Sequence, residues 1–176
     1  MVSDAEPWVG TWRQAEAIFD PAPPRTIRFT VIGTPATQGS KVGFVNKKTN
    51  RVVVKEHTDA RTRTWRSDVV DAARTALGDG RPLDGPVALD VTFRFARPAG
   101  HYGTGRNRDT LKASAPARPS AGRRYDLDKL QRAVLDALSD AKVIYDDCQV
   151  VDITASKHYT RDRAQPEGAA IILTEL

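Results

Sequence analysis

The sequence is poor in cysteine and in long apolar runs, and each absence excludes a class of protein. The single cysteine, Cys148, cannot form an internal disulfide, which argues against a disulfide-stapled secreted domain and favours a reducing compartment. No apolar run approaches the roughly 18–20 residues that a membrane helix needs. The first residues show neither a basic start nor an apolar block, so we expect no secretory signal. The composition therefore predicts a cytoplasmic protein that is not held in a membrane.

The net charge of +5 conceals a strong asymmetry along the chain. Residues 41–66 hold eight basic and two acidic side chains, and residues 94–124 hold eight basic side chains and one acidic one. Residues 125–176 reverse the balance, with six basic and ten acidic side chains. This pattern suits contacts with nucleic-acid phosphates beside an acidic, metal-binding pocket. Ordinary solvated faces of a slightly basic protein explain the same charges equally well.

The 176 residues suit one domain with a real hydrophobic core. We assign residues 26–176 to that domain and residues 1–25 to an N-terminal extension that contains a short amphipathic helix. Apolar residues that recur at every second position predict strands, and apolar residues that recur every three to four positions predict helices. Strands are expected at 26–32, 41–45, 51–55, 87–95, 150–159 and 169–173, and helices at 60–77 and 127–141. This order predicts an α+β fold with a mixed β-sheet.

Two segments place basic side chains outside regular structure. The turn of the hairpin over residues 41–55 holds Lys47 and Lys48. The connection over residues 96–124 is rich in Gly, Pro and Arg, and includes Arg106 and Arg108. A long connection without periodicity is usually functional or disordered, and this composition favours a mobile loop that binds phosphate.

Two pairs of aspartates flank the helix expected at 127–141. Asp126 and Asp128 stand at its start, and Asp146 and Asp147 precede the strand that follows it. If three of these carboxylates converge, their repulsion calls for a cation, and hard oxygen ligands select Mg²⁺ or Mn²⁺. Because a helix of about 15 residues spans roughly 22 Å, the pairs meet only if the tertiary structure arranges it. Helix capping and turn formation explain the same residues without a metal.

These motifs together resemble a known family. The segment Asp126-Leu-Asp-Lys-Leu130, the helix after it, Asp146-Asp-Cys-Gln-Val-Val-Asp152 and Lys157 are similar to the Holliday junction resolvases of the RusA type, which occur in bacteria, phages and prophages. The segments Gly33-Thr-Pro35 and Gln38-Gly-Ser40 look like the N-terminal half of phage-type members. The likeness spans about residues 26–176 and is densest over residues 123–157.

The resemblance implies a small α+β homodimer, in which two main helices pack on a mixed sheet. Such an enzyme cuts four-way DNA junctions by paired nicks and uses Mg²⁺, with Mn²⁺ as a substitute. The essential acids of the family match Asp126, Asp128 and Asp147, with Asp146 beside them. A two-fold symmetric substrate suits a dimer that carries two active sites.

The basic positions match the family less closely. Members often have Asn after the second Asp and Lys four residues after it, where this chain has Lys129 and Arg132. Arginine retains a phosphate contact but cannot donate a proton, because its pKa lies above about 12. Lys129 is then the nearest substitute for the family lysine, and Lys157 matches a basic position on the following strand.

We therefore interpret the chain as a metal-dependent, structure-selective endodeoxyribonuclease that resolves Holliday junctions or other branched DNA in recombination and repair. Lys129 and Arg132 are expected to act beside the aspartates at the scissile phosphate. The other expected DNA contacts come from Lys157, Arg123, Arg124, Arg106, Arg108, Lys47 and Lys48. We expect the enzyme to act in the cytoplasm of a bacterium or of a phage-infected host. The alternative is a protein that binds branched or duplex DNA without cutting it.

Overall fold

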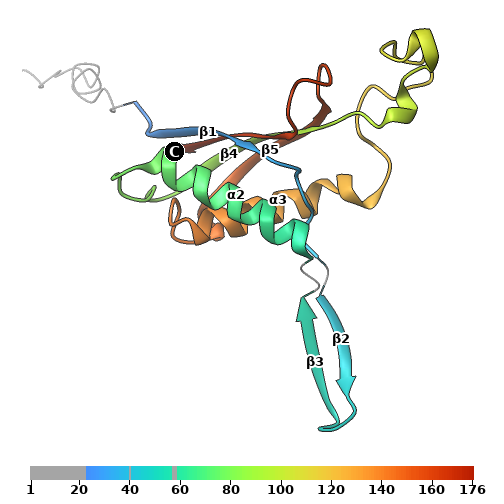
Figure 1. Cartoon of the computed structure of the whole chain (residues 1–176). Helices are drawn as coiled ribbons and strands as arrows, with labels where there is room; N and C mark the ends of the chain where they lie inside the picture. The colour runs from blue at the N-terminus through green and yellow to red at the C-terminus, as the bar shows by residue number, and fades with distance from the viewer. Residues whose placement is uncertain (1–22, 40, 57–58) are drawn as a thin grey trace, which may run out of the picture.

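A four-stranded mixed sheet with two helices on one face forms the body of the molecule (Figure 1). The computed structural model describes residues 23–39, 41–56 and 59–176. Its strand order is β1 (Thr26–Ile32), β6 (Gly168–Glu175), β4 (Val87–Phe95) and β5 (Val150–Tyr159). Neighbouring strands run antiparallel except β4 and β5, which run parallel. The predicted α+β fold with a mixed sheet is confirmed.

The alternation of apolar residues in β4 sets which face of the sheet is covered. Val91 and Phe93 in the middle of this strand are fully buried, whereas Asp90 between Leu89 and Val91 is exposed. The covering helices are α2 (Ala60–Leu77) and α3 (Leu127–Asp140). Since side chains alternate across a strand, the odd-numbered residues of β4 pack under the helices and the even-numbered ones face away.

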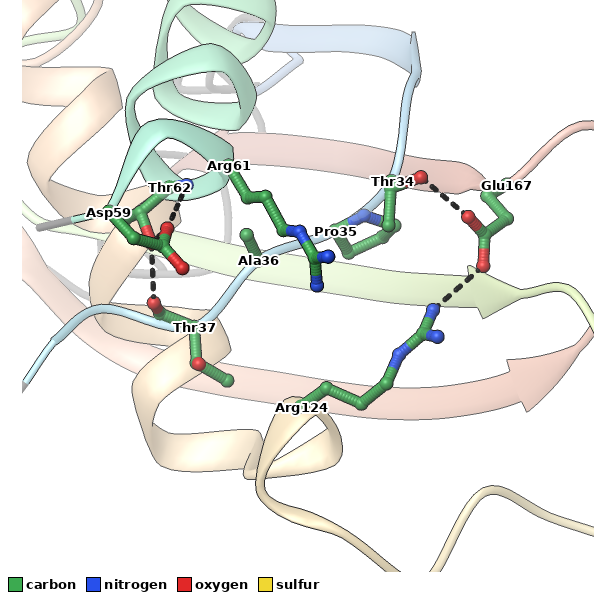
Figure 2. A pocket seen from close by; sticks show the side chains of 9 residues that line it. All are labelled: Thr34, Pro35, Ala36, Thr37, Asp59, Arg61, Thr62, Arg124 and Glu167. Atoms are coloured by element: carbon green, nitrogen blue, oxygen red, sulfur yellow. Dashed lines mark hydrogen bonds and ion pairs between the residues drawn. The ribbon is translucent and has the colours of Figure 1, made fainter.

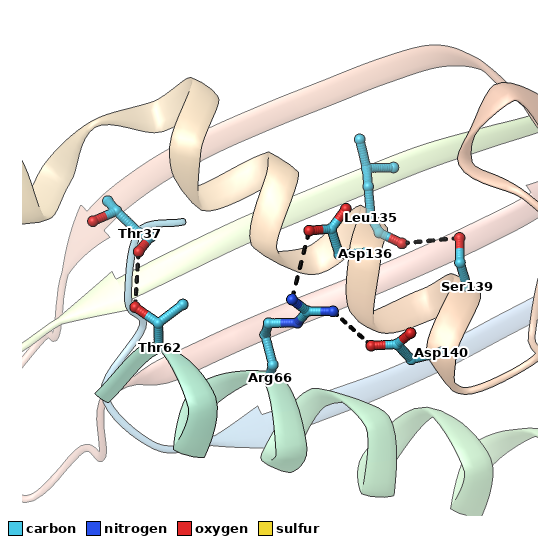
Figure 3. A network of polar contacts seen from close by, with 7 residues as sticks. All are labelled: Thr37, Thr62, Arg66, Leu135, Asp136, Ser139 and Asp140. Atoms are coloured by element: carbon cyan, nitrogen blue, oxygen red, sulfur yellow. Dashed lines mark hydrogen bonds and ion pairs between the residues drawn. The ribbon is translucent and has the colours of Figure 1, made fainter. Parts of the chain in front are cut away.

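The two helices are joined by polar contacts as well as by the core. Arg66 of α2 lies 3.7 Å from Asp136 and 2.6 Å from Asp140 of α3, so that one guanidinium holds two carboxylates (Figure 3). At the start of α2, the Asp59 carboxylate accepts the Thr62 backbone N–H at 2.8 Å. The Arg66 contacts hold α3 beside α2, and the Asp59 bond caps the first turn of α2.

The predicted hairpin is present as a separate two-stranded sheet that projects from the body (Figure 1). Strands β2 (Lys41–Asn46) and β3 (Arg51–Glu56) pair in antiparallel register, and Asn46 faces Arg51 across the turn. Asn50 adopts a positive φ of 48° in this turn, and the tip residues 47–50 are exposed. The basic tip is thus held away from the core.

The long connection over residues 96–124 has more local structure than its sequence indicated. It contains the 3-10 turns η1 (Ala99–His101), η2 (Gly105–Asn107) and the first part of η3 (Arg123–Tyr125), and a β-bridge joins Tyr102 to Leu111. The Arg163 guanidinium lies 4.3 Å from the centre of the Tyr102 ring, which is buried. Arginine–aromatic stacking of this kind organises a segment without apolar periodicity.

Two further expectations concern the N-terminal extension and membrane-spanning helices. The amphipathic helix predicted in the N-terminal extension falls within residues 1–22, which lie outside the described residues. Among the residues that are described, no helix combines the length and apolarity needed to cross a membrane.

We expect Gly168→Ala to destabilise the fold strongly. Gly168 opens β6 at φ 158°, and a Cβ there would lie 2.0 Å from the Val31 carbonyl oxygen, a backbone atom of the paired strand. The loss should exceed about 1 kcal/mol, because alanine at an incompatible φ costs more than the entropy it saves. Urea unfolding measures this loss. The control is Gly100→Ala, where a Cβ meets no atom within 4 Å; equal stability of the two variants would contradict the steric account.

Candidate active site

The first aspartate pair lies where α3 begins, at one end of the sheet. Asp126 is the N-cap residue of α3 and Asp128 lies in its first turn. The Asp126 side chain makes no capping hydrogen bond. It pairs instead with Lys129, whose Nζ lies 3.1 Å from Asp126 Oδ2. The capping role that this residue type usually plays is therefore absent, and the carboxylate is available for other contacts.

The electrostatics of this pair favour a charged carboxylate. A hydrogen bond shared with Asp128 lowers the pKa of Asp126, and Lys129 and Lys157 lower it further. The Asp126 side chain is 39% exposed, so solvent reaches it. A pair of adjacent, accessible carboxyls suits a hard divalent cation, because the cation removes the repulsion that arises when both carry charge.

Strand β5 brings a basic residue to the same place. Lys157 donates a hydrogen bond from Nζ to the Tyr125 carbonyl oxygen, next to Asp126. The Tyr125 ring is in turn held edge-on to Phe95 at 4.8 Å. A depression of about 460 Å³ opens here, and its lining residues are Ser120, Gly122, Tyr125, Asp126, Leu127 and Lys157. The site thus combines a carboxylate pair, two lysines and space for a ligand.

The second aspartate pair lies at the opposite end of α3. Asp146 caps the 3-10 turn η4 (Asp147–Gln149), with Oδ1 accepting the Cys148 N–H at 3.0 Å. This N–H is the main cause of the lowered pKa of Asp146. A hydrogen bond with Asp146 also raises the pKa of the Cys148 thiol, which makes the thiolate unfavourable. Asp146 therefore shapes the turn, and Asp147 is exposed on it.

One chain does not bring the two aspartate pairs together. The 14 residues of α3 span about 21 Å. The chain does return along the sheet, but β5 starts at Val150, after both aspartates, so the residue that reaches Asp126 is Lys157. Among the described parts of the chain, no group of three His, Cys, Asp or Glu residues is placed to hold a metal ion. A metal site formed by all four carboxylates stays a prediction.

The remaining basic candidates are spread over three regions. Arg132 is exposed on α3, one turn after Asp128. Arg124 lies 2.9 Å from Glu167 and stacks on the rings of Phe95 and Tyr125. Four more of the basic candidates are exposed and lie away from the aspartate pair: Arg106 and Arg108 near η2, and Lys47 and Lys48 at the hairpin tip. Arg123 belongs to η3, beside Arg124.

Sequence reasoning assigned no role to Gln149 or Glu167, although each fixes part of the site. Gln149 Oε1 accepts the N–H groups of Tyr145 and Asp146, and its Nε2 donates to the carbonyls of Leu83 and Gly85. A Gln three residues after a capping Asp is the pattern of a capping box, which could have indicated this role. Glu167 gave no such signal, because its partners are far away in the sequence: Thr34, Ala96 and Arg124.

Comparison with known proteins gives one family. The model described as "RusA: Endodeoxyribonuclease RusA" matches residues 36–165, which is most of the chain. The matched span contains both aspartate pairs, the hairpin and the basic connection. No curated protein matches the chain.

We expect Gln149→Ala to loosen the turn that carries Asp147. The change leaves two N–H groups and two carbonyls without their partner, and the expected loss is about 1–3 kcal/mol in the free energy of unfolding. Urea titration of both variants provides the measurement. The control is Gln131→Ala on α3, whose side chain makes no recorded hydrogen bond within the described chain; a similar loss there would refute the role given to Gln149.

Proposed function

We propose, from the fact that this chain belongs to the endodeoxyribonuclease RusA family, that it is a metal-dependent nuclease that resolves four-way or other branched DNA by paired nicks. The observation that carries the metal-dependent chemistry is the Asp126–Asp128 pair, accessible and uncommitted to capping, between Lys129 and Lys157. We also propose that it acts in the cytoplasm of a bacterium or of a phage-infected host, where branched DNA would be its substrate.

Each residue of the site then has a distinct task. Asp126 and Asp128 would bind Mg²⁺, or Mn²⁺ in its place, because both ions prefer carboxylate oxygens. The bound ion supplies charge neutralisation at the scissile phosphate and activation of water. Lys129 orients Asp126 through their 3.1 Å contact. Lys157 lies at the N-terminus of α3, where it donates to the Tyr125 carbonyl. Arg132, on the exposed side of α3, would hold the phosphate as a permanent cation.

The free edge of β5 supports a homodimer. This strand pairs with β4 on one side, and no described strand pairs with its other side. Residues 151–154 are all exposed, and they include apolar Val151 at 63% and Ile153 at 38%. Tyr145, 60% exposed, lies in the adjoining turn region. An exposed apolar strand edge favours pairing with another strand, and a second copy of β5 is self-complementary in an antiparallel arrangement.

Such a dimer would also reunite the two aspartate pairs. Antiparallel pairing centred between Asp152 and Ile153, the middle of the exposed stretch, pairs Val150 with the partner's Ala155. It brings the partner's η4 turn, which carries Asp147, towards the end of β5 that holds Lys157. Lys157 reaches the Asp126 site in its own chain. Paired strands lie about 4.8 Å apart, so the partner's Asp147 would come near Asp126 and Asp128. We therefore propose that each metal site takes Asp126 and Asp128 from one chain and Asp147, with Asp146 beside it, from the other.

Asp128→Asn should abolish cutting and preserve binding. Loss of a metal ligand removes several kcal/mol of transition-state stabilisation, which makes cleavage at least about 100-fold slower. The measurement is nicking of a labelled four-way junction in Mg²⁺ and in EDTA, with junction affinity measured in EDTA. The control is Asp90→Asn, a carboxylate exposed on the uncovered face of β4. Cutting by Asp128→Asn at the normal rate would remove Asp128 from the site.

The same assay separates the enzyme from the alternative, a branched-DNA binding protein without catalysis. Cleavage by the wild type in Mg²⁺ or Mn²⁺, and none in EDTA, supports the nuclease. Binding of junctions without cutting in either metal, across a range of pH, would leave only the binding protein.

Mixing two inactive variants tests whether the site is shared between chains. Consider a heterodimer of Asp126→Asn with Asp147→Asn. If the site is shared between chains, both substitutions fall in one active site and the other active site is intact. Each heterodimer should then nick one strand of the junction with its one active site. Because random pairing makes about half of the dimers heterodimers, a co-refolded mixture should hold about a quarter of the wild-type number of active sites. Each variant refolded alone is the control. If the mixture stays as inactive as the separate variants, the site lies within one chain.

A further inference from the structure

A second cavity lies beside the aspartate pair and has no assigned role. Its volume is about 460 Å³. It is lined by the segment after β1, the start of α2, η3 and the residue before β6; the lining residues are Thr34, Pro35, Ala36, Thr37, Asp59, Arg61, Thr62, Arg124 and Glu167. Figure 2 shows the Arg61 side chain reaching from α2 into this space, with Arg124 approaching from the opposite side. We name it the Arg61 pocket.

The Arg61 pocket lies between the hairpin and the aspartates. Thr37 and Asp59 line it on the two flanks of the hairpin, since β2 begins at residue 41 and β3 ends at residue 56. On the other side, Arg124 is two residues from Asp126. The Gln38 N–H also donates to the Lys129 carbonyl at 3.0 Å, which fastens the wall of the pocket to the first turn of α3. A DNA strand that touches both the basic tip and the aspartates therefore passes this pocket.

The charges in the pocket leave Arg61 available to an anion. Both oxygens of Glu167 are already occupied, Oε1 by the Ala96 N–H and Arg124 and Oε2 by Thr34. The Asp59 carboxylate accepts from the N–H and hydroxyl of Thr62, and these bonds are the main cause of its lowered pKa. Arg61 also lowers the pKa of Asp59, through its positive charge and its backbone N–H. The Arg61 guanidinium itself makes no hydrogen bond or ion pair with the residues that the structure describes, so its donors are open to a ligand.

The chemistry of the lining favours phosphate over a nucleobase. A guanidinium offers a planar fork of donors that matches two phosphate oxygens. Arg124 retains further donors beyond the one that contacts Glu167. No aromatic side chain lines the pocket, whereas sites that hold unpaired bases commonly stack them on aromatic rings.

We propose that the Arg61 pocket binds one backbone phosphate of the DNA strand that runs from the hairpin to the Asp126–Asp128 pair. The proposal rests on the proposed function for the identity of its ligand. Arg61 contacts this phosphate directly and Arg124 supports it from the opposite wall. The contact sets the register of the strand, and so the position at which the strand is cut.

The experiment combines Arg61→Gln with neutralisation of single phosphates. A four-way junction is prepared with one methylphosphonate, an uncharged phosphate analogue, moved step by step along the strand near the cut. Affinity is measured in EDTA, where no cutting occurs. For the wild type, one methylphosphonate position should weaken binding about tenfold, the effect of losing one charge-assisted contact. Arg61→Gln should weaken binding of the unmodified junction by a similar factor and should be insensitive to that same position.

Two variants control for charge and for folding. Arg28→Gln removes an equal charge from an exposed position on β1 outside the pocket, and it should keep the wild-type methylphosphonate profile. Arg61→Lys keeps the charge without the fork and should restore part of the lost affinity. Arg61→Gln should also lower the slope of log affinity against log salt by about 0.9.

The outcomes separate this proposal from the proposed function. If Arg61→Gln keeps the wild-type methylphosphonate profile, the pocket does not bind a phosphate, even when the junction is cut normally. If the sensitivity disappears selectively in Arg61→Gln, the pocket is supported, even when no metal produces cutting. A uniform loss of affinity at every position, with the profile unchanged, would show only a long-range charge effect and would also overturn the proposal.

Discussion

The parallel pairing of β4 and β5 is the constraint from which the arrangement of the site follows. Two parallel neighbours need a crossover between them, and α3 provides it. The helix must then run opposite to the strands, so its start lies at the end of the sheet where β4 and β5 finish. Asp126 therefore meets Lys157, from the end of β5, although 31 positions separate them. The same geometry sends Asp147 to the far end.

Polar contacts between distant segments hold this end of the molecule in place. Glu167 joins the residue after β4, the segment after β1 and the turn before α3 through three bonds of 2.6–2.9 Å. Arg124, one of its partners, also covers the Phe95 and Tyr125 rings. A carboxylate whose oxygens are all used stabilises the framework without competing for the ligand. Asp126, which pairs with Lys129, and Arg61, whose guanidinium makes no ion pair with the described residues, are then the charged groups left for the proposed substrate.

The structure places the basic and acidic segments of the chain at different positions. The basic tip of the hairpin projects from the body, the Arg61 pocket lies at its base, and the aspartate pair follows. A phosphate backbone attracted by the basic segments would then approach the Asp126–Asp128 pair, where we propose that a cation binds. Long-range attraction and local chemistry are therefore carried by different parts of the chain, and the net charge of +5 reports neither of them.

The local elements and the residue types of the candidate site could be predicted from the sequence. The strand at 26–32 and the helix at 60–77 have the predicted bounds, because periodicity reports which side of an element is buried. The aspartate motifs were also visible, since they are contiguous. Tertiary structure alone decided that Asp126 meets Lys157 and not Asp147, that Glu167 gathers three distant partners, and that Arg61 enters a pocket. It also ordered residues 99–111, which the sequence indicated to be irregular. These features depend on strand order and on side chains that meet across tens of residues, and such contacts leave no periodic signal in the local sequence.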